Sequence, residues 1–291
     1  MIIMECVSGN LPYIGVVGVG VVGSALLKSF DIKQIKTISF DKYKTNVRDG
    51  YAQNLKDCLV CDILFLCLPT LINDKDSSNG SAGDQHMAGF DKKAIYETCK
   101  YLNDNLYQGI VVLKSTVEPG ITAHLAGFYN NLKIIHNPEF LSAATAFEDF
   151  HNQTHVVLGG ESELTDKVAE FFKKFYPDAK ISQCSSVESE SMKIFANSFY
   201  AVKIQFFNEL YLACNHSGAD FKVVRDLMLK NGWINPQHTE VPGKDKQLSY
   251  GGMCFPKDTV ALENYLISSG VPCGVLTATI KERNTMRIFH V

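Results

Sequence analysis

The first part of the chain alternates short apolar runs with amphipathic stretches. Six runs have the near-continuous apolar composition of buried strands, namely residues 13–17, 35–40, 62–68, 109–114, 133–136 and 155–159. Helical patterns lie between most of them, for example over residues 21–30, 91–106 and 163–175. Buried strands that alternate with helices are typical of a doubly wound sheet of parallel strands. We therefore predict an α/β fold, a Rossmann-like doubly wound parallel sheet, over residues 1–184.

The pattern changes after Cys184. Residues 186–215 contain neither glycine nor proline, and apolar residues recur there at helical spacing: Met192, Phe195, Phe199, Val202, Phe206 and Leu210. A helix of about thirty residues with an apolar stripe usually packs against other helices of its domain or against a partner subunit. We predict that residues 185–291 form a smaller, all-helical domain for dimerisation and substrate binding, and that the long helix joins two copies in a homodimer.

Composition narrows the class of protein. Hydrophobic residues make up 46% and charged residues 20% of the 291 residues, and the net charge is −3, so neither nucleic acid nor an anionic membrane is an expected partner. No apolar run approaches the roughly 18 residues that a membrane span needs. The first ten residues lack the basic start of a secretion signal. Residues 73–90 are polar and predict a mobile surface loop.

The cysteines indicate the compartment. There are nine, an odd number, and several lie inside apolar strands, which is typical of reduced thiols in a cytoplasmic protein. Cys58 and Cys61 have the spacing of a redox motif, but they also fit one face of a short helix that leads into a strand. We interpret them as inert, with a metal or redox role as the alternative, and predict no metal site.

A glycine-rich turn follows the first predicted strand and opens a helix. Its residues are Gly18, Val19, Gly20, Val21, Val22 and Gly23. Glycines in this context allow the backbone to approach a pyrophosphate, and the helix N-terminus offers amide donors. Asp41 ends the next strand, where a carboxylate accepts hydrogen bonds from an adenosine ribose and repels a 2′-phosphate, which favours NAD over NADP. Lys42 and Lys44 weaken that preference, and a glycine turn without a cofactor is the alternative.

Three further segments carry reactive groups. Ser115 and Thr116 follow the fourth strand and Glu139 follows the fifth, at the carboxyl edge where doubly wound folds bind ligands. Turn capping and a solvated loop are the structural alternatives for these positions. Lys193 and Asn197 lie four residues apart on the long helix, so they share one face, with a surface pair as the alternative.

Cys254 follows two glycines, and Pro256-Lys257-Asp258 comes after it. This arrangement suits a thiol presented at the start of a helix, where the helix dipole and Lys257 favour the thiolate. A buried packing cysteine is the alternative.

These segments together resemble one family. The glycine fingerprint is followed in order by Ser115-Thr116-Val117-x-Pro119-Gly120, Asn137-Pro138-Glu139-Phe140-Leu141, Glu190-x-x-Lys193-x-x-x-Asn197 and Gly251-Gly252-x-Cys254-x-Pro256-Lys257-Asp258. The last block is highly specific, and the order of the others makes chance agreement implausible. The chain resembles the UDP-glucose/GDP-mannose dehydrogenases over nearly its full length.

The resemblance implies an NAD-dependent oxidoreductase of nucleotide-sugar metabolism, similar to UDP-glucose 6-dehydrogenase. It would oxidise the C6 alcohol of a nucleotide sugar to a carboxylate in a four-electron reaction, with UDP-glucose to UDP-glucuronate as the first expectation. Lys193 and Asn197 would stabilise the developing oxyanion, and Thr116 and Asp258 would hold a water that accepts the proton. Cys254 would add to the aldehyde and form a thiohemiacetal and then a thioester, which is hydrolysed with Glu139 handling the proton.

The resemblance also implies binding residues. The expected cofactor contacts are the six residues of the glycine turn with Asp41, Pro69, Thr70, Ser115 and Thr116. The expected substrate contacts are Glu139, Phe140, Leu141, Lys193, Asn197, His238, Tyr250, Gly251 and Lys257.

Departures from the family pattern keep other functions open. Ser142 and Ala143 stand where the family has Arg-Glu, and the loop before Gly251 offers His238, Lys244 and Lys246 where the family has an arginine. We expect a short form of the family that lacks the C-terminal UDP-binding domain. One alternative is a dehydrogenase of a simpler sugar or of a β-hydroxy acid, which has no need of Cys254. A catalytically silent NAD-binding scaffold is the other.

Overall fold

The chain divides into two compact units. The computed structural model describes residues 12–44, 50–72 and 89–287. One unit, here called the sheet unit, comprises Met1–Pro69, Lys92–Ser115 and Pro119–Glu190. The other, here called the helical unit, comprises Thr70–Asp91, Thr116–Glu118 and Ser191–Val291. The two short segments Thr70–Asp91 and Thr116–Glu118 matter for the site, because they place Phe90, Thr116 and Glu118 in the helical unit.

A seven-stranded sheet forms the centre of the sheet unit. Its strands are β1 (Ile14–Val17), β2 (Thr37–Phe40), β3 (Ile63–Leu66), β4 (Ile110–Leu113), β5 (Lys133–His136), β6 (His155–Gly159) and β7 (Lys180–Cys184). Their order is β2-β1-β3-β4-β5-β6-β7, and every neighbouring pair is parallel except β5 and β6. The doubly wound sheet is therefore confirmed, with one antiparallel pair. β7 was not predicted, because its partly exposed residues lack the apolar run of an inner strand.

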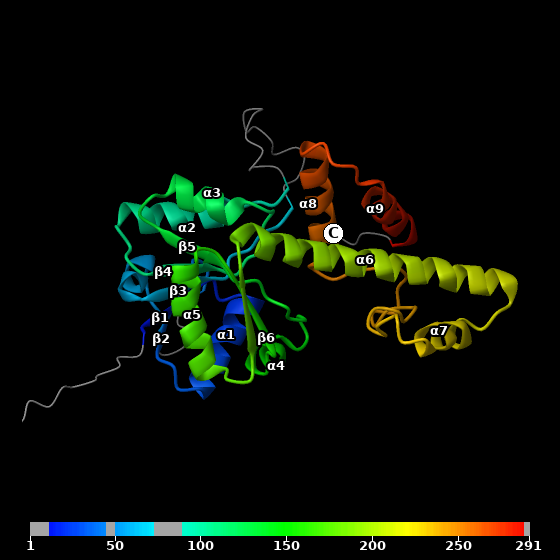
Figure 1. Ribbon diagram of the computed structural model, residues 1–291, viewed down its shortest axis with the longest axis horizontal. Coiled ribbons are helices and arrows are strands. Elements are labelled where there is room, and N and C mark those ends of the chain that lie inside the picture. Colours follow the sequence, from blue (N-terminus) through cyan, green and yellow to red (C-terminus); the bar gives the residue numbers. More distant parts are fainter. Residues whose placement is uncertain (1–11, 45–49, 73–88, 288–291) are drawn as a thin grey trace, which may run out of the picture. The chain divides into compact units, whose positions relative to one another are not determined.

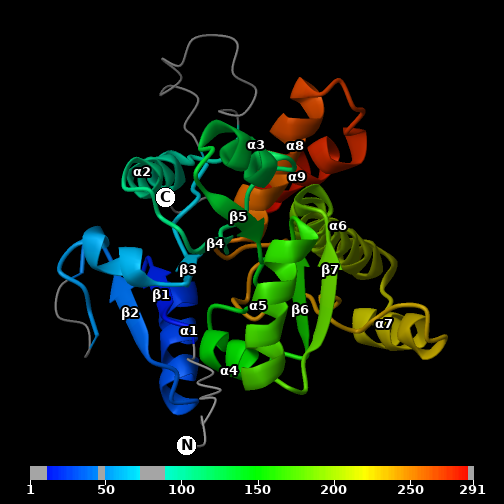
Figure 2. The ribbon, with the colours of Figure 1, turned by 60° about the vertical axis from the view of Figure 1, so that its left-hand side comes forward.

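Helices cover both faces of this sheet (Figure 2). One face carries α1 (Val21–Ile32), α4 (Ala146–His151) and α5 (Ser162–Phe175), and the other carries α2 (Lys93–Asp104) and α3 (Ile121–Phe128). Beneath the first group, the rings of Phe30, Phe65 and Phe171 lie within 5.7–6.1 Å of one another. Burial of each such side chain contributes about 1.5–3 kcal/mol.

A short 3₁₀ helix, η1 (Leu55–Val60), precedes β3 and carries Cys58 as predicted, whereas Cys61 lies just beyond its end. Cys58 and Cys61 are both buried, and burial raises the pKa of each thiol to about 12. Such thiols are protonated at neutral pH, which favours the inert interpretation. Within the described part of the chain, no helix is long and apolar enough to cross a membrane.

The helical unit is organised along α6 (Ser186–Ser217), whose first residues belong to the sheet unit. It also contains α7 (Phe221–Lys230), α8 (Phe255–Ser268) and α9 (Gly274–Met286), and Figure 1 shows α7 near the C-terminal end of α6. The predicted long helix is confirmed, but its apolar stripe is only partly covered: Val202 packs on the core, while the phenylalanines are exposed. Phe199 and Phe206 are 62% and 52% exposed, whereas Ile194, Ala201 and Gln205 are buried. The exposed phenylalanines of α6 are thus available for contact with another protein surface.

The segment predicted as a surface loop, residues 73–90, lies mostly outside the described residues. Its last residue is described and contradicts that prediction. Phe90 is 0% exposed and packs with Ile194, Ala261, Leu262 and Leu276 in the core of the helical unit.

Candidate functional site

The glycine turn has the geometry of a pyrophosphate cradle. Gly18 has φ +89°, and a Cβ there would lie 2.4 Å from the carbonyl oxygen of Cys67. A Cβ on Gly23 would lie 1.9 Å from the carbonyl oxygen of Gly18, so neither position tolerates a side chain. Gly20, which precedes α1, has open space instead, and no side chain caps the helix. The amides at this helix start therefore face a surface that an anion can approach.

Asp41 is attached to this turn. Its Oδ2 accepts the Val19 N–H at 2.7 Å, and its Oδ1 accepts the Tyr43 N–H at 2.9 Å. The Lys44 ammonium donates to the Val19 carbonyl at 2.5 Å. Each Asp41 oxygen has a second acceptor site, so the carboxylate can still receive ribose hydroxyls. The open turn, the uncapped helix and this carboxylate fit a dinucleotide.

The other predicted cofactor residues differ in accessibility. The Ser115 hydroxyl donates to the Leu68 carbonyl at 2.7 Å and accepts the Leu68 N–H at 3.1 Å, so it joins the ends of β3 and β4. Pro69 is exposed, whereas Thr70 and Thr116 are buried and belong to the helical unit. Val21 is 53% exposed and Val22 packs on the core.

Glu139 lies after β5 and is half-buried. Its Oε2 accepts the Leu141 N–H at 2.6 Å, which fixes the turn that it belongs to. Phe140 is 47% exposed and stacks on His155, and Leu141 packs against the core of the sheet unit. Phe140 is thus the accessible apolar side chain at this turn.

The helical unit brings a second polar group together. Asp258 lies in the first turn of α8 and is 0% exposed. Its Oδ2 accepts from Asn197 Nδ2 of α6 at 2.6 Å, and its Oδ1 accepts from Lys257 Nζ at 2.6 Å. Lys193, one turn before Asn197, is 4% exposed. α6 and α8 thus bring together Asn197 and Asp258, which are 61 residues apart in the sequence, and Asp258 also holds the Lys257 ammonium.

Cys254 immediately precedes α8. Among the described cysteines it is the one with an exposed side chain. Its carbonyl accepts the Asp258 N–H at 2.9 Å, and Gly252 has φ +77°, so the chain turns sharply before entering the helix. A helix N-terminus favours the thiolate. The predicted help from Lys257 is not supported, because its ammonium is hydrogen-bonded to Asp258.

Two buried polar residues of α6 hold the loop that leads to Cys254. The Asn208 Oδ1 accepts the Ser249 N–H at 2.8 Å, and the Gln205 Oε1 accepts from the Ser249 hydroxyl at 2.5 Å. Ser249 has φ +59°, a conformation that costs a non-glycine residue about 1–2 kcal/mol. These bonds stabilise it in that conformation.

Two arginines of the C-terminal region hold the same loop from its carbonyl side. Arg283 Nε donates to the Tyr250 carbonyl and Arg287 Nη1 donates to the Ser249 carbonyl, both at 3.1 Å. A Cβ on Gly251 would lie 2.3 Å from the Arg287 guanidinium carbon. Tyr250 is 1% exposed, and its ring lies 5.5 Å from the Arg283 guanidinium. Tyr250 and Gly251 therefore shape the loop, and the phenol is not exposed to a substrate.

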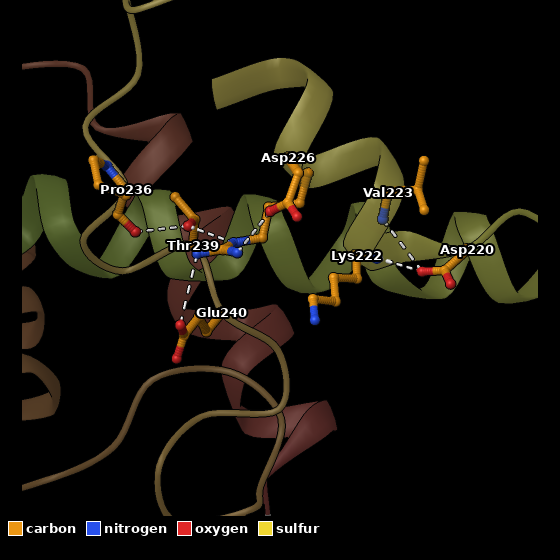
Figure 3. Close-up of polar contacts among 8 residues, drawn as sticks. Asp220, Lys222, Val223, Asp226, Pro236, Thr239 and Glu240 are labelled. Atoms are coloured by element: carbon orange, nitrogen blue, oxygen red, sulfur yellow. Dashed lines mark hydrogen bonds and ion pairs between the residues drawn. The ribbon is translucent and has the colours of Figure 1, made fainter. Parts of the chain in front are cut away.

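An earlier part of the loop is tied to α7 (Figure 3). Arg225 Nε donates to Thr239 Oγ1 at 2.8 Å, and the Thr239 hydroxyl donates to the Pro236 carbonyl at 2.7 Å. Arg225 also pairs with Asp226 at 3.1 Å and with Glu240 at 3.7 Å. This arginine is engaged within the fold.

His238 packs in a cluster with two aromatic rings, its centroid 5.0 Å from that of Tyr200 and 5.5 Å from that of Phe255. Burial lowers the pKa of His238, and the charges of Lys203 and Lys244 lower it further. The imidazole is therefore neutral at pH 7 and offers hydrogen bonds rather than a positive charge.

Several residues of this centre were missed from the sequence. Gln205, Asn208, Arg283 and Phe90 support the loop or the polar group, and each is distant in sequence from the residue that it contacts. Polar residues inside an otherwise apolar helical segment were the signal for the first two.

Sequence models of one family match most of the chain. The model described as "UDP-glucose/GDP-mannose dehydrogenase family, NAD binding domain" matches residues 52–178, and the model of the family's central domain matches residues 187–285. The UDP-glucose 6-dehydrogenase of Rickettsia prowazekii (strain Madrid E) is 32% identical over 202 residues, which are 65% of this chain and 43% of that protein. The match therefore spans less than half the length of that relative.

Solved structures share the fold. A UDP-glucose dehydrogenase from the hyperthermophilic archaeon Pyrobaculum islandicum has a TM-score of 0.79 at 22% identity, covering 96% of this chain and 69% of its own. The 3-hydroxyisobutyrate dehydrogenase of Mycobacterium tuberculosis has a TM-score of 0.71 at 12% identity, covering 93% of this chain and 92% of its own. The domain matches identify NAD as the cofactor of the sheet-forming domain, and the chain belongs to the UDP-glucose/GDP-mannose dehydrogenase family.

Proposed function

We propose that the protein oxidises the C6 primary alcohol of a nucleotide sugar to a carboxylate, with UDP-glucose as the first substrate to test. One observation carries the proposal. An exposed thiol, Cys254, immediately precedes α8, and the first turn of that helix holds buried Asp258, which accepts a hydrogen bond from Asn197 of α6. A hydroxy-acid dehydrogenase needs no thiol, whereas oxidation of an aldehyde to an acid needs a nucleophile that traps the aldehyde.

The residues of the helical unit account for the first oxidation. Bound NAD supplies a hydride acceptor, and two NAD are used for each sugar. As hydride leaves C6, negative charge develops on the oxygen, and the Lys193 ammonium with the Asn197 amide stabilises that charge. Asp258, with Thr116, orients a water that takes the hydroxyl proton.

Cys254 carries the second oxidation. Its thiolate sulfur bonds to the aldehyde carbon, and the aldehyde oxygen takes up a proton, giving a thiohemiacetal. Loss of a second hydride and of that proton gives a thioester. Water then adds to the thioester carbon with Glu139 accepting its proton, the C–S bond breaks, and the carboxylate leaves with the thiol regenerated.

We propose Phe140, His238 and Lys257 as substrate contacts, with His238 as a neutral hydrogen-bonding group. Tyr250 and Gly251 act through the backbone of the loop.

A homodimer is part of the proposal. The support is the exposed part of the α6 stripe, where Phe199 is 62% and Phe206 is 52% exposed. α7 likewise has no buried residue in the described chain, and its Val223 and Leu227 are 55% and 60% exposed. Large apolar side chains gathered on neighbouring helices are typical of a surface that another subunit covers.

A dehydrogenase of a β-hydroxy acid is the second candidate. It is favoured by the fold shared with the 3-hydroxyisobutyrate dehydrogenase, of which 92% is covered. The helix lysine and asparagine would serve that reaction too, while Cys254 would have no role in it.

A substrate panel distinguishes these functions. NADH formation is measured with UDP-glucose, UDP-N-acetyl sugars, GDP-mannose and 3-hydroxyisobutyrate. The proposal expects two NADH for each molecule of one nucleotide sugar and none with the hydroxy acid. One NADH per 3-hydroxyisobutyrate would establish the second candidate, and NAD binding without turnover on any substrate would favour a silent scaffold.

A further inference from the structure

Phe90 occupies an unexpected place in the helical unit. It is 0% exposed, yet it ends a polar segment, and it packs with Ile194 of α6 and with Ala261 and Leu262 of α8. Residues 72 and 90 form an antiparallel bridge, and the Asp91 N–H donates to the Leu71 carbonyl at 2.7 Å. The backbone around Phe90 is therefore held on both sides.

A buried carboxylate fixes this backbone. Glu118 is 5% exposed, and its Oε1 accepts the Phe90 N–H at 2.8 Å. The preceding residue, Gly89, has φ +89°, and a Cβ there would lie 2.3 Å from the same oxygen. Because Gly89 has no side chain, the Glu118 carboxylate can reach the Phe90 N–H. This hydrogen bond fixes the backbone of Phe90 and thereby the position of its ring.

The ring in turn contacts a charge. Lys257 Nζ lies 4.4 Å from the centroid of the Phe90 ring and 2.6 Å from Asp258 Oδ1. An aromatic face attracts a cation, and the attraction increases when the pair is shielded from water. The Lys257 side chain is 20% exposed and Asp258 is 0% exposed, so the ammonium is held between a ring and a buried carboxylate.

The orientation of the carboxylate depends on that ammonium. Asp258 has one oxygen on Lys257 and the other on Asn197, at 2.6 Å each. If Lys257 left, Asp258 would lose a charge-assisted bond in a buried site and would rotate or recruit water to replace it.

We propose that Phe90, held by Glu118, is a positioning residue that keeps the Lys257 ammonium on Asp258 and thereby sets the orientation of Asp258 towards Asn197. Neither residue touches the reacting atoms. The contribution to catalysis rests on the function proposed above, whereas the contact itself does not.

The contact is tested without a substrate. Wild type is treated with an amine-acetylating reagent, and the labelling rate of Lys257 is measured by mass spectrometry relative to exposed Lys281 in the same digest. Phe90→Leu and Phe90→Met remove the ring but keep an apolar side chain, and both are expected to label several-fold faster at Lys257. Phe207→Leu is the matched control, because it removes another buried ring of the helical unit, and it should leave the rate unchanged.

Glu118 provides a second pair of variants. Glu118→Gln keeps an oxygen that accepts the Phe90 N–H and should label like wild type, whereas Glu118→Leu removes it and should label like Phe90→Leu. A Lys257 rate in folded Phe90→Leu or Phe90→Met equal to that of wild type would overturn the proposal. So would a rate in Phe207→Leu that rises as much.

Activity then tests the catalytic consequence. With the sugar that wild type oxidises, kcat is expected to fall about tenfold in Phe90→Leu with little change in KM, and Glu118→Gln is expected to restore it relative to Glu118→Leu. Faster labelling with unchanged kcat would overturn the positioning role. Wild-type turnover is measured first. If wild type oxidises no sugar, the proposed function is contradicted, whereas the contact between Phe90 and Lys257 is still tested by the labelling rates.

Discussion

Replacement of Asn208 by alanine tests how the loop before Cys254 is held. The substitution removes the oxygen that accepts the Ser249 N–H at 2.8 Å, and both residues are buried, at 1% and 4% exposure. A buried amide left without an acceptor costs about 1–3 kcal/mol. Ser249 also keeps φ +59°, a strained conformation for a residue with a side chain. We expect Asn208→Ala to lower the free energy of unfolding by about 2 kcal/mol.

Urea titration followed by circular dichroism measures this change, and the thermal midpoint should fall by about 3 °C. Glu209→Ala is the control, because Glu209 is the exposed neighbour on the same helix turn, and it should change stability by less than about 0.5 kcal/mol. Equal stability of wild type and Asn208→Ala would refute the view that α6 fixes the loop.

Three other predictions concern the thiols, a helix cap and the dimer. At pH 8, iodoacetamide should modify exposed Cys254 and spare Cys61, because a pKa of about 12 leaves about one thiolate in ten thousand at Cys61. Mass spectrometry after digestion measures both reactions, and equal modification of the two thiols would contradict the prediction. Glu190→Ala should lower the free energy of unfolding by about 2–5 kcal/mol in a urea titration. The reason is that the buried carboxylate accepts two backbone N–H groups at the start of α3, at 2.6 and 2.7 Å. A loss below about 1 kcal/mol would contradict that role. Phe206→Ser should convert a dimer to a monomer in light scattering, and a monomeric wild type would refute the dimer.

The elements of the sheet followed from the sequence because buried parallel strands are apolar throughout. β5 and β6 occur over the predicted residues, and β1, β3 and β4 differ only at their ends. β7 was missed because an edge strand is covered on fewer sides and carries polar residues such as Gln183. The residue pattern of one strand alone does not show whether the strand will lie inside the sheet or at its edge.

The site was less accessible to sequence reasoning where a residue's role depends on distant partners. The spacing of Lys193 and Asn197 placed them on one face of α6, but it did not reveal that Asp258 receives the amide. Phe90 was predicted to lie in a polar surface loop, because its sequence neighbours are polar. Its place in a core depends on contacts with α6 and α8, which are far away in the sequence. Tyr250 was expected at the substrate, yet it is buried under Arg283.

The central claim is that Cys254 forms a covalent bond with the aldehyde during a four-electron oxidation. The most direct test is the number of NADH formed per nucleotide sugar by wild type and by Cys254→Ser, with intact-protein mass spectrometry of samples quenched during turnover. The account predicts two NADH and a sugar adduct on Cys254 in wild type, and no more than one NADH and no such adduct in Cys254→Ser. Two NADH per sugar from Cys254→Ser at the wild-type rate would contradict it.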